Sequence, residues 1–277
     1  MPDILIDGLL FGEGPRWHQG ALWLSDMHAQ QVLKVSSDGT KEVIVEIASD
    51  QPSGLGWLPN GDLLIVSMTD RALLRYDGYE LAHHADLSEL ASWYCNDMVV
   101  DHQGRAYVGN FGFDLHNNAP MKTAELICVE PNGEARVVAE DLSFPNGTVI
   151  TPDGQTLIVG ESFGGKLTAF TIEENGDLKA PRTWADLPEG SVPDGICLDA
   201  DGGIWCASPT SNECLRIIEG GEVTHRIELE RLGIACMLGG DKLYVLTSTS
   251  SHPDECKERK DARIEIYDAP HPGAGLP

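Results

Sequence analysis

Short apolar runs separated by polar turns recur along the whole chain. Most runs are rich in Val, Ile, Leu and aromatic residues, and they end at turns such as LPNGD, DHQGR, TPDGQ and DADGG. This pattern is typical of β-strands joined by hairpins. Long stretches with helical periodicity are nearly absent, so the sequence predicts an all-β protein.

The strand pattern repeats six times. Each unit has an opening residue, usually followed by Gly, then a short strand, a turn, a second apolar strand and two further strands. The second apolar runs align at intervals of 39 to 50 residues, at Trp23, Leu64, Tyr107, Leu157, Trp205 and Tyr244. A period of this length with four strands per unit predicts a six-bladed β-propeller of four-stranded blades.

The two ends of the chain are expected to complete one blade. The strand DILIDGL (3–9) precedes the first unit, and RIEIYDA (263–269) ends the sixth. Pairing of the N-terminal strand with the C-terminal blade would close the ring. We therefore expect residues 1–277 to form a single propeller domain.

The opening residues of the six units differ although the strands around them repeat. The first strand of each propeller blade lines the central channel, so equivalent openers should form one ring around the axis. Counting back from the aligned second strands selects Glu13, Ser53, Asn96, Asn146, Asp194 and Ile234. Because the strands repeat while the opening residues differ, we infer that all six blades contribute to one asymmetric site.

This predicted ring contains two carboxylates and no Lys or Arg. Unpaired carboxylates on a narrow channel wall repel each other and lose hydration, so a bound cation would stabilise them. Carboxylate and amide oxygens without His or thiolate favour one divalent ion, Ca²⁺ first, with Mg²⁺, Mn²⁺ and Zn²⁺ as alternatives.

Several phrases of the sequence resemble the senescence marker protein/gluconolactonase/luciferin-regenerating enzyme-like family. They are GEGPRW (12–17), NDMVVDHQGRAYVG (96–109), FPNGTVITPDG (144–154), PDGICLDADGGIW (193–205) and ACMLGG (235–240). The resemblance implies a six-bladed propeller with one catalytic divalent metal in its channel. By the same resemblance, the metal ligands are Glu13, Asn96, Asn146 and Asp194.

The resemblance implies a metal-dependent lactonase that hydrolyses a lactone or related cyclic ester to the hydroxy acid. In this hypothesis the metal polarises the carbonyl and Asp194 is the general base, with Glu13 as second choice. Asn96 either binds the metal or orients the substrate. The alternative is a noncatalytic propeller that binds Ca²⁺ or a partner protein. A serine hydrolase is a further rival that we do not expect here.

The substrate pocket is expected to be less polar than that of a sugar lactonase. Sugar-lactonase members of the family carry Arg two residues before the equivalent of Asn96, where this chain has Tyr94. The segment 110–125, which forms a lid in the family, contains Phe111, Phe113, Leu115, His116 and Met121. The side chains predicted to contact an apolar or aromatic lactone or ester are Tyr94, Asn96, Phe113, His116 and Met121.

Charge and composition limit the classes of molecule that the protein is expected to bind. The 19 Lys and Arg against 44 Asp and Glu give a net charge of -25, which disfavours nucleic acid and anionic membranes and suits a small uncharged substrate or a cation. The sequence begins without a basic, apolar leader, so we expect a cytoplasmic protein, monomeric or weakly homo-oligomeric. Its seven cysteines form no CxxC pair, which predicts reduced, structural cysteines.

Overall fold

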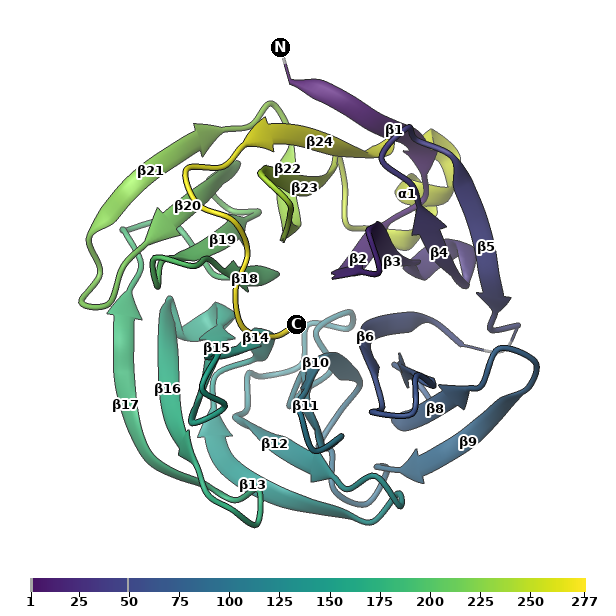
Figure 1. Ribbon diagram of the computed structural model, residues 1–277, viewed down its shortest axis with the longest axis vertical. Helices are drawn as coiled ribbons and strands as arrows, with labels where there is room; N and C mark the ends of the chain where they lie inside the picture. The colour runs from purple at the N-terminus through teal and green to yellow at the C-terminus, as the bar shows by residue number, and fades with distance from the viewer. Residues whose placement is uncertain (1, 49) are drawn as a thin grey trace.

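The computed structural model describes residues 2–48 and 50–277. It contains six four-stranded antiparallel sheets, arranged as blades around a central channel (Figure 1). The predicted six-bladed β-propeller is therefore confirmed, and each repeat unit of the sequence supplies the inner strands of one blade.

Blades 1 to 3 are formed by consecutive strands from the channel outward. Blade 1 contains β2 (Gly12–His18), β3 (Ala21–Asp26), β4 (Gln31–Val35) and β5 (Lys41–Glu46). Blade 2 contains β6 (Pro52–Trp57), β7 (Leu63–Ser67), β8 (Ala72–Tyr76) and β9 (Leu81–Asp86). Blade 3 contains β10 (Cys95–Val100), β11 (Ala106–Asn110), β12 (Ala124–Val129) and β13 (Ala135–Leu142).

Blades 4 and 5 repeat this arrangement, and blade 6 combines both ends of the chain. Blade 4 contains β14 (Pro145–Ile150), β15 (Thr156–Glu161), β16 (Lys166–Ile172) and β17 (Leu178–Asp186). Blade 5 contains β18 (Ile196–Leu198), β19 (Ile204–Ser208), β20 (Glu213–Ile217) and β21 (Val223–Glu228). Blade 6 contains β22 (Leu232–Gly239), β23 (Lys242–Ser248), β24 (Ala262–Asp268) and, outermost, β1 (Asp3–Leu9).

The N-terminal strand closes the ring as predicted. Strand β1 pairs antiparallel with β24, with Asp3 opposite Ile266 and Ile4 opposite Glu265. Figure 1 shows the purple β1 alongside the yellow β24. Because the first and last parts of the chain share one sheet, the ring cannot open without breaking strand pairing.

Helical segments are short. They are η1 (Met27–Ala29), η2 (Ser162–Gly164) and α1 (Pro253–Arg259). Among the described residues, no helix is long and apolar enough to cross a membrane.

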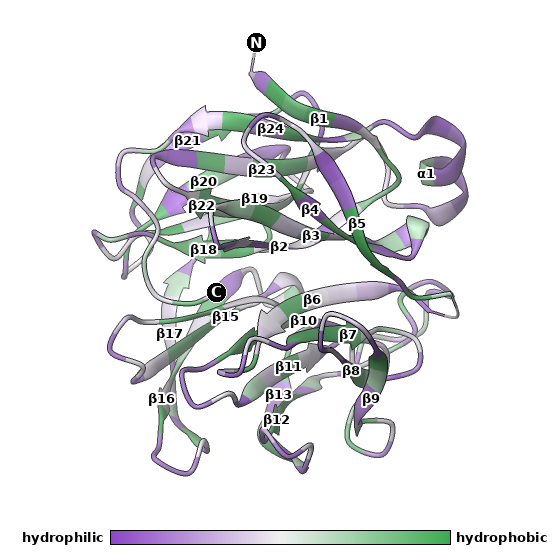
Figure 2. Cartoon of the chain, turned by 45° about the vertical axis from the view of Figure 1, so that its right-hand side comes forward, coloured by the Kyte–Doolittle hydropathy of each residue, from purple (hydrophilic) through white to green (hydrophobic). Residues whose placement is uncertain are grey.

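The apolar core lies between neighbouring blades. Between blades 2 and 3, Leu64 and Val66 of β7 and Val108 of β11 belong to one buried cluster, and comparable clusters fill the other junctions. Inner strands are thus covered on both faces, which explains their continuous apolar runs. In Figure 2, hydrophilic segments gather at the turns that connect the strands. All seven cysteines are buried and free, as expected of small apolar residues.

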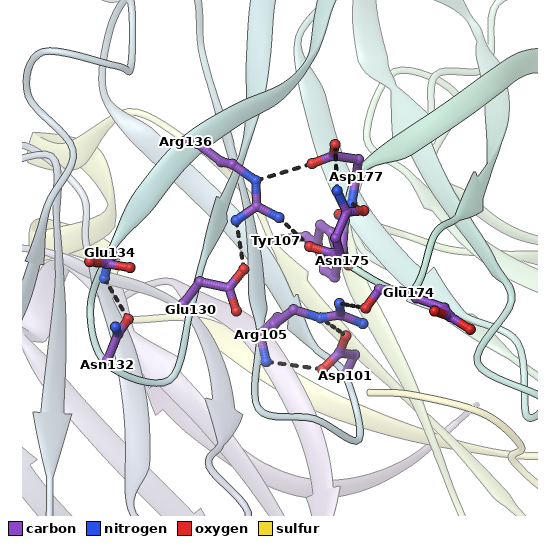
Figure 3. Close-up of polar contacts among 11 residues, drawn as sticks. Asp101, Arg105, Tyr107, Glu130, Asn132, Glu134, Arg136, Glu174, Asn175 and Asp177 are labelled. Atoms are coloured by element: carbon purple, nitrogen blue, oxygen red, sulfur yellow. Dashed lines mark hydrogen bonds and ion pairs between the residues drawn. The ribbon is translucent and has the colours of Figure 1, made fainter.

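Two arginines, of which Arg105 is buried and Arg136 half-buried, tie blade 3 to blade 4 (Figure 3). Arg105 pairs with Asp101 at 2.7 Å and donates to the Glu174 carbonyl at 2.8 Å. Arg136 pairs with Asp177 at 3.1 Å, in the same turn between β16 and β17. We call these five residues the arginine network. Its guanidinium groups face acceptors of the adjacent blade, so these charges hold neighbouring sheets in register.

The C-terminal segment covers one end of the channel. Leu276 bridges to Ile150 and Gly273 bridges to Asp199, and the yellow chain end lies near the centre of Figure 1. Ile150 is the last residue of β14, whereas the predicted ring residue Asn146 lies at the start of that strand. The segment therefore covers the end of the channel opposite the predicted ring.

Candidate active site

The repeat-derived openers come together in one cavity. This cavity has a volume of about 730 Å³, and its wall includes Glu13, Asn96, Asn146, Asp194 and Ile234. Ser53 lies at the corresponding place in β6 but is buried outside the cavity wall. The structure thus brings all four predicted metal ligands together at the start of the inner strands.

Backbone irregularities direct the ring side chains. In β2 the register with β3 shifts between Glu13 and Arg16, and β14 shifts between Pro145 and Thr148. Such bulges turn a side chain away from the regular alternation of a strand.

Close contact between inner strands explains the glycine that follows most openers. The Gly147 amide donates to the Asp194 carbonyl at 3.1 Å. A Cβ atom on Gly147 would lie 2.5 Å from the Ile196 nitrogen, a distance that no side chain tolerates. The repeated phrase of opener plus Gly is therefore a packing requirement near the axis.

Buried polar side chains also hold the backbone that leads into the ring. In four blades a residue at the end of the second strand accepts a hydrogen bond from a backbone N–H two or three positions before a ring residue. The pairs are Asp26 with Phe11 (2.9 Å), Asn110 with Trp93 (3.4 Å), Glu161 with Ser143 (2.8 Å) and Ser208 with Val192 (3.0 Å). These contacts fix the approach to Glu13, Asn96, Asn146 and Asp194.

The two ring carboxylates are unpaired. Glu13 and Asp194 reach solvent only in part, line the cavity, and form no ion pair with a described residue. Enclosure in the protein, followed by repulsion from Asp194 and Asp97, raises the pKa of Glu13 well above its ordinary value. Enclosure raises the pKa of Asp194 to about 8, although a hydrogen bond from Asn146 opposes the change. The metal-free site therefore disfavours its own negative charge.

An ion pair that the sequence reasoning missed lies beside the ring. Asp97 and Arg16 are both buried, and their charged groups are 2.5 Å apart. Arg16 also donates to the Leu55 carbonyl at 2.9 Å. Glu13, Asp97 and Asp194 against one guanidinium leave a formal charge of -2, which matches one divalent cation. The available signal was the residue after Asn96, which is Asp where the other polar openers have Gly.

The two ring amides donate to the protein and keep their carbonyl oxygens free. Asn96 Nδ2 donates to the Pro145 carbonyl at 3.3 Å, and Asn146 Nδ2 donates to Ser162 Oγ at 3.2 Å. Neither Oδ1 atom accepts a hydrogen bond from a described residue. Within residues 2–48 and 50–277 no three His, Cys, Asp or Glu side chains form a metal cluster. The donors that the ring offers are carboxylate and amide oxygens, which suit Ca²⁺ and Mg²⁺.

Ser162 fits the sequence pattern of a serine hydrolase but not its geometry. Residues 160–164 read GESFG, which matches the G-x-S-x-G elbow. The Ser162 hydroxyl donates to the Pro193 carbonyl at 2.7 Å and accepts from Asn146. Neither partner is an imidazole, so no general base activates this hydroxyl. Ser162 instead accepts from the Asn146 amide and so orients its carbonyl oxygen toward the cavity ligand.

The cavity wall above the ring is largely apolar. Phe111 stacks on Phe144 with ring centroids 4.5 Å apart, and Phe163 meets Phe144 edge-on at 5.1 Å. The other large apolar residues of the wall are Phe11, Met27, Met68 and Leu115. This lining agrees with the expectation of a pocket of low polarity.

The residues predicted to contact substrate have different positions. Asn96 and His116 line the cavity. Tyr94 stacks on Trp93 behind the wall, and buried Phe113 packs behind the wall against Phe144 and Phe163. Met121 is 48% exposed and lies off the wall. Tyr94, Phe113 and Met121 thus differ from the expectation, because aromatic residues that precede β2 and β14 occupy the wall instead.

Comparison with known proteins assigns the chain to a family. Residues 11–252 match the model described as SMP-30/Gluconolactonase/LRE-like region. Regucalcin of Xenopus laevis is 23% identical over 92% of this chain and 89% of its own length. The 6-deoxy-6-sulfogluconolactonase of Pseudomonas putida is 27% identical over 59% of this chain and 56% of its own length.

Solved structures share the architecture. A gluconolactonase from Xanthomonas campestris superimposes with a TM-score of 0.74 at 23% identity, covering 95% of this chain and 89% of that protein. A luciferin-regenerating enzyme reaches a TM-score of 0.81 at 16% identity, covering 99% and 98% of the two chains. At these identities the likeness establishes a common propeller fold.

Proposed function

The chain belongs to the SMP-30/gluconolactonase/LRE-like family, and from that premise we propose that it is a metal-dependent lactonase. It would hydrolyse a lactone or related cyclic ester to the hydroxy acid. The observation that carries the proposal is the ring of Glu13, Asn96, Asn146 and Asp194, with two unpaired carboxylates at one cavity. Relatives named gluconolactonase and 6-deoxy-6-sulfogluconolactonase support the same reaction class.

The ring fits one hard divalent cation. Its ligands would be Glu13, Asn96, Asn146 and Asp194. Such an ion, Ca²⁺ before Mg²⁺, Mn²⁺ or Zn²⁺, would supply the Lewis acid that polarises the lactone carbonyl. The buried Arg16–Asp97 pair holds the ring from below and leaves the net negative charge to the two open carboxylates.

Asp194 is the proposed general base. It takes a proton from the attacking water as the water oxygen bonds to the carbonyl carbon, and returns it to the ring oxygen as the ester bond breaks. In the metal-free protein a pKa of about 8 leaves Asp194 mostly protonated near neutrality, and a bound dication would lower this pKa and leave the carboxylate free to accept a proton. Glu13 is the second candidate. Asn96 completes the ligand set of the metal or, as the alternative, orients the carbonyl. The apolar wall limits access of bulk water.

We infer that the substrate carries apolar or aromatic groups. The Phe111, Phe144 and Phe163 rings offer faces and edges to a flat or aliphatic substituent. A polyhydroxylated aldonolactone would leave several hydroxyls against these rings without partners.

A pH-indicator assay on EDTA-stripped protein tests the proposal. Aldonolactones and aryl lactones such as dihydrocoumarin are compared before and after Ca²⁺, Mg²⁺, Mn²⁺ or Zn²⁺ is added back. We expect acid release that returns with one metal, fastest for the aryl lactone. Silence across the panel, with metal binding confirmed by calorimetry, would reject the lactonase and favour a Ca²⁺-binding propeller.

A further inference from the structure

One buried histidine in the cavity wall is left without a hydrogen-bond partner. His28 lies in η1, directly after β3, and is 9% exposed. Neither Nδ1 nor Nε2 has a partner. Among the described residues the other buried unpaired nitrogens belong to Trp23, His84, Trp93 and Trp205, and none of these lines the cavity. Among these residues, His28 is therefore the one that lines the cavity, and both of its ring nitrogens are buried in the cavity wall without a hydrogen-bond partner.

The surroundings of His28 suit a neutral partner. Its ring lies 5.3 Å from the Phe11 ring, and His116, Ser251 and His252 of the same wall act on it from nearby. Burial, with smaller contributions from Lys257 and His116, lowers the pKa of His28 to about 4. The imidazole is consequently neutral near pH 7 and offers one donor and one acceptor. A hydroxyl or carbonyl oxygen matches these groups.

Strand register places His28 farther along the channel than the ring residue Glu13, on the side of the cavity mouth. Glu13 is opposite Ser25, whereas the Met27 amide donates to the Phe11 carbonyl, two residue steps nearer the cavity mouth. Two to three steps at the rise of a β-strand correspond to about 7–10 Å. Phe11 and Met27, both apolar, line the wall in between. A molecule that spans this distance needs an apolar middle and a polar far end.

The cavity volume agrees with such a ligand. At about 730 Å³ the cavity lies in the range of pockets that enclose drug-sized molecules. A bare lactone ring at the metal would leave most of it unfilled. The space between the ring and η1 is therefore available to a substituent on the lactone.

We propose that His28 is a specificity-determining residue that hydrogen-bonds a neutral oxygen at the far end of an apolar arm of the substrate. The substrate class is then a lactone with an aliphatic or aromatic arm that ends in a hydroxyl or ketone. This inference rests on the proposed lactonase function. His28 contacts the arm and takes no part in the proton transfer at Asp194.

The test uses two matched lactones and one variant. The probes are γ-nonalactone and its analogue with the terminal methyl replaced by hydroxyl, assayed with the holoprotein and with His28→Leu. We expect the unmodified protein to prefer the hydroxylated lactone at least about tenfold in kcat/KM. A lactone without the terminal hydroxyl would leave the buried His28 imidazole unpaired. His28→Leu should reduce this preference to about twofold or less, mainly through KM.

Two further variants separate recognition from structure. His28→Asn keeps a donor and an acceptor and should retain part of the preference. His84→Leu is the matched control, because His84 Nε2 is also buried and unpaired but lies outside the cavity. It should leave the preference unchanged. The melting temperature of His28→Leu should equal or exceed that of the unmodified protein, since an unpaired polar group is removed.

The outcomes distinguish this inference from the function beneath it. If both lactones are hydrolysed with equal efficiency, or if His28→Leu slows both by one factor, the assignment of His28 is wrong and the lactonase stands. If neither lactone nor the wider panel is hydrolysed with any of the metals, the proposed function fails and the role of His28 fails with it.

Discussion

The ring and the arginine network differ in whether their charged groups are paired. In the network, Arg105 pairs with Asp101 and Arg136 pairs with Asp177, and each guanidinium has further acceptors. In the ring, Glu13 and Asp194 have no cationic partner among the described residues, and enclosure raises the pKa of both. The same fold thus contains one site where charge is satisfied and one where it is not.

This difference distinguishes charged groups that stabilise the propeller from charged groups that are available to bind a ligand. A buried carboxylate that is paired holds its surroundings in place, as Asp101 does for its own turn and for Arg105, which donates to the Glu174 carbonyl of blade 4. A buried carboxylate without a partner destabilises the metal-free fold, and such groups concentrate at functional sites. Replacing a carboxylate by an amide should therefore destabilise the metal-free protein in the arginine network but not in the ring.

The largest contrast should be the pH dependence of the metal-free protein. Folded Asp194 has a pKa of about 8 against an ordinary value of 3.8, so between these values the folded state holds a proton that the unfolded state has released. The free energy of unfolding should therefore fall as pH rises through this window. One pKa unit corresponds to about 1.4 kcal/mol, so the fall across the whole window reaches roughly 6 kcal/mol at most.

Saturating Ca²⁺ should remove most of that slope, because a bound dication keeps its ligands ionised at lower pH. Urea unfolding at about pH 5 and about pH 8, in EDTA and in Ca²⁺, measures both effects. Equal stability of the EDTA-treated protein at the two pH values, or no stabilisation by any divalent ion, would count against a metal site at the ring.

Asp194→Asn should lower kcat by about a thousandfold, which is about 4 kcal/mol of activation free energy. The amide still offers an oxygen to the metal but cannot accept the proton from water. Steady-state kinetics beside calorimetric metal titration separate these roles. Much of the metal affinity should remain, and near-normal turnover would reject Asp194 as the base.

Asp101→Asn makes the same chemical change in the arginine network. Here the substitution leaves buried Arg105 without its carboxylate, so we expect a loss of about 3 kcal/mol in the free energy of unfolding. Turnover of the folded enzyme should stay the same, because Asp101 lies outside the cavity wall. Denaturant unfolding with parallel kinetics gives both values. A variant as stable as the parent would remove the structural role assigned to this ion pair.

The fold and the ring could be predicted because both depend on the repeat. Rotational symmetry converts a local spacing into a position in space, so Glu13, Asn146 and Asp194 could be placed on one ring from residue numbers alone. Asp97 was missed although it breaks the pattern, since it replaces the Gly that follows the other polar openers. Departures from a repeat are therefore as informative as the repeat itself.

The cavity wall could not be predicted in the same way. Its aromatic residues come from loops of different blades, where no repeat constrains the path. Phe144 of blade 4 contacts both Phe111 of blade 3 and Phe163 on the wall, while Phe113 lies behind the wall. Which of several nearby aromatic residues faces the substrate depends on packing between blades, and a single sequence does not contain that information in local form.

Phe163→Ala gives the smallest effect and the sharpest test of the wall. Phe163 is 50% exposed, lines the cavity and meets Phe144 edge-on, so its removal should change the free energy of unfolding by about 0.5 kcal/mol or less. It should raise KM for dihydrocoumarin about three- to tenfold, because a lost aromatic contact is worth about 0.5–1.5 kcal/mol, and leave kcat unchanged. Tyr79→Ala is the control, since Tyr79 is 96% exposed and lies off the cavity wall. An equal rise in KM for an aldonolactone would mean that Phe163 shapes the cavity mouth without selecting aromatic substrates, and the apolar wall would lose its part in specificity.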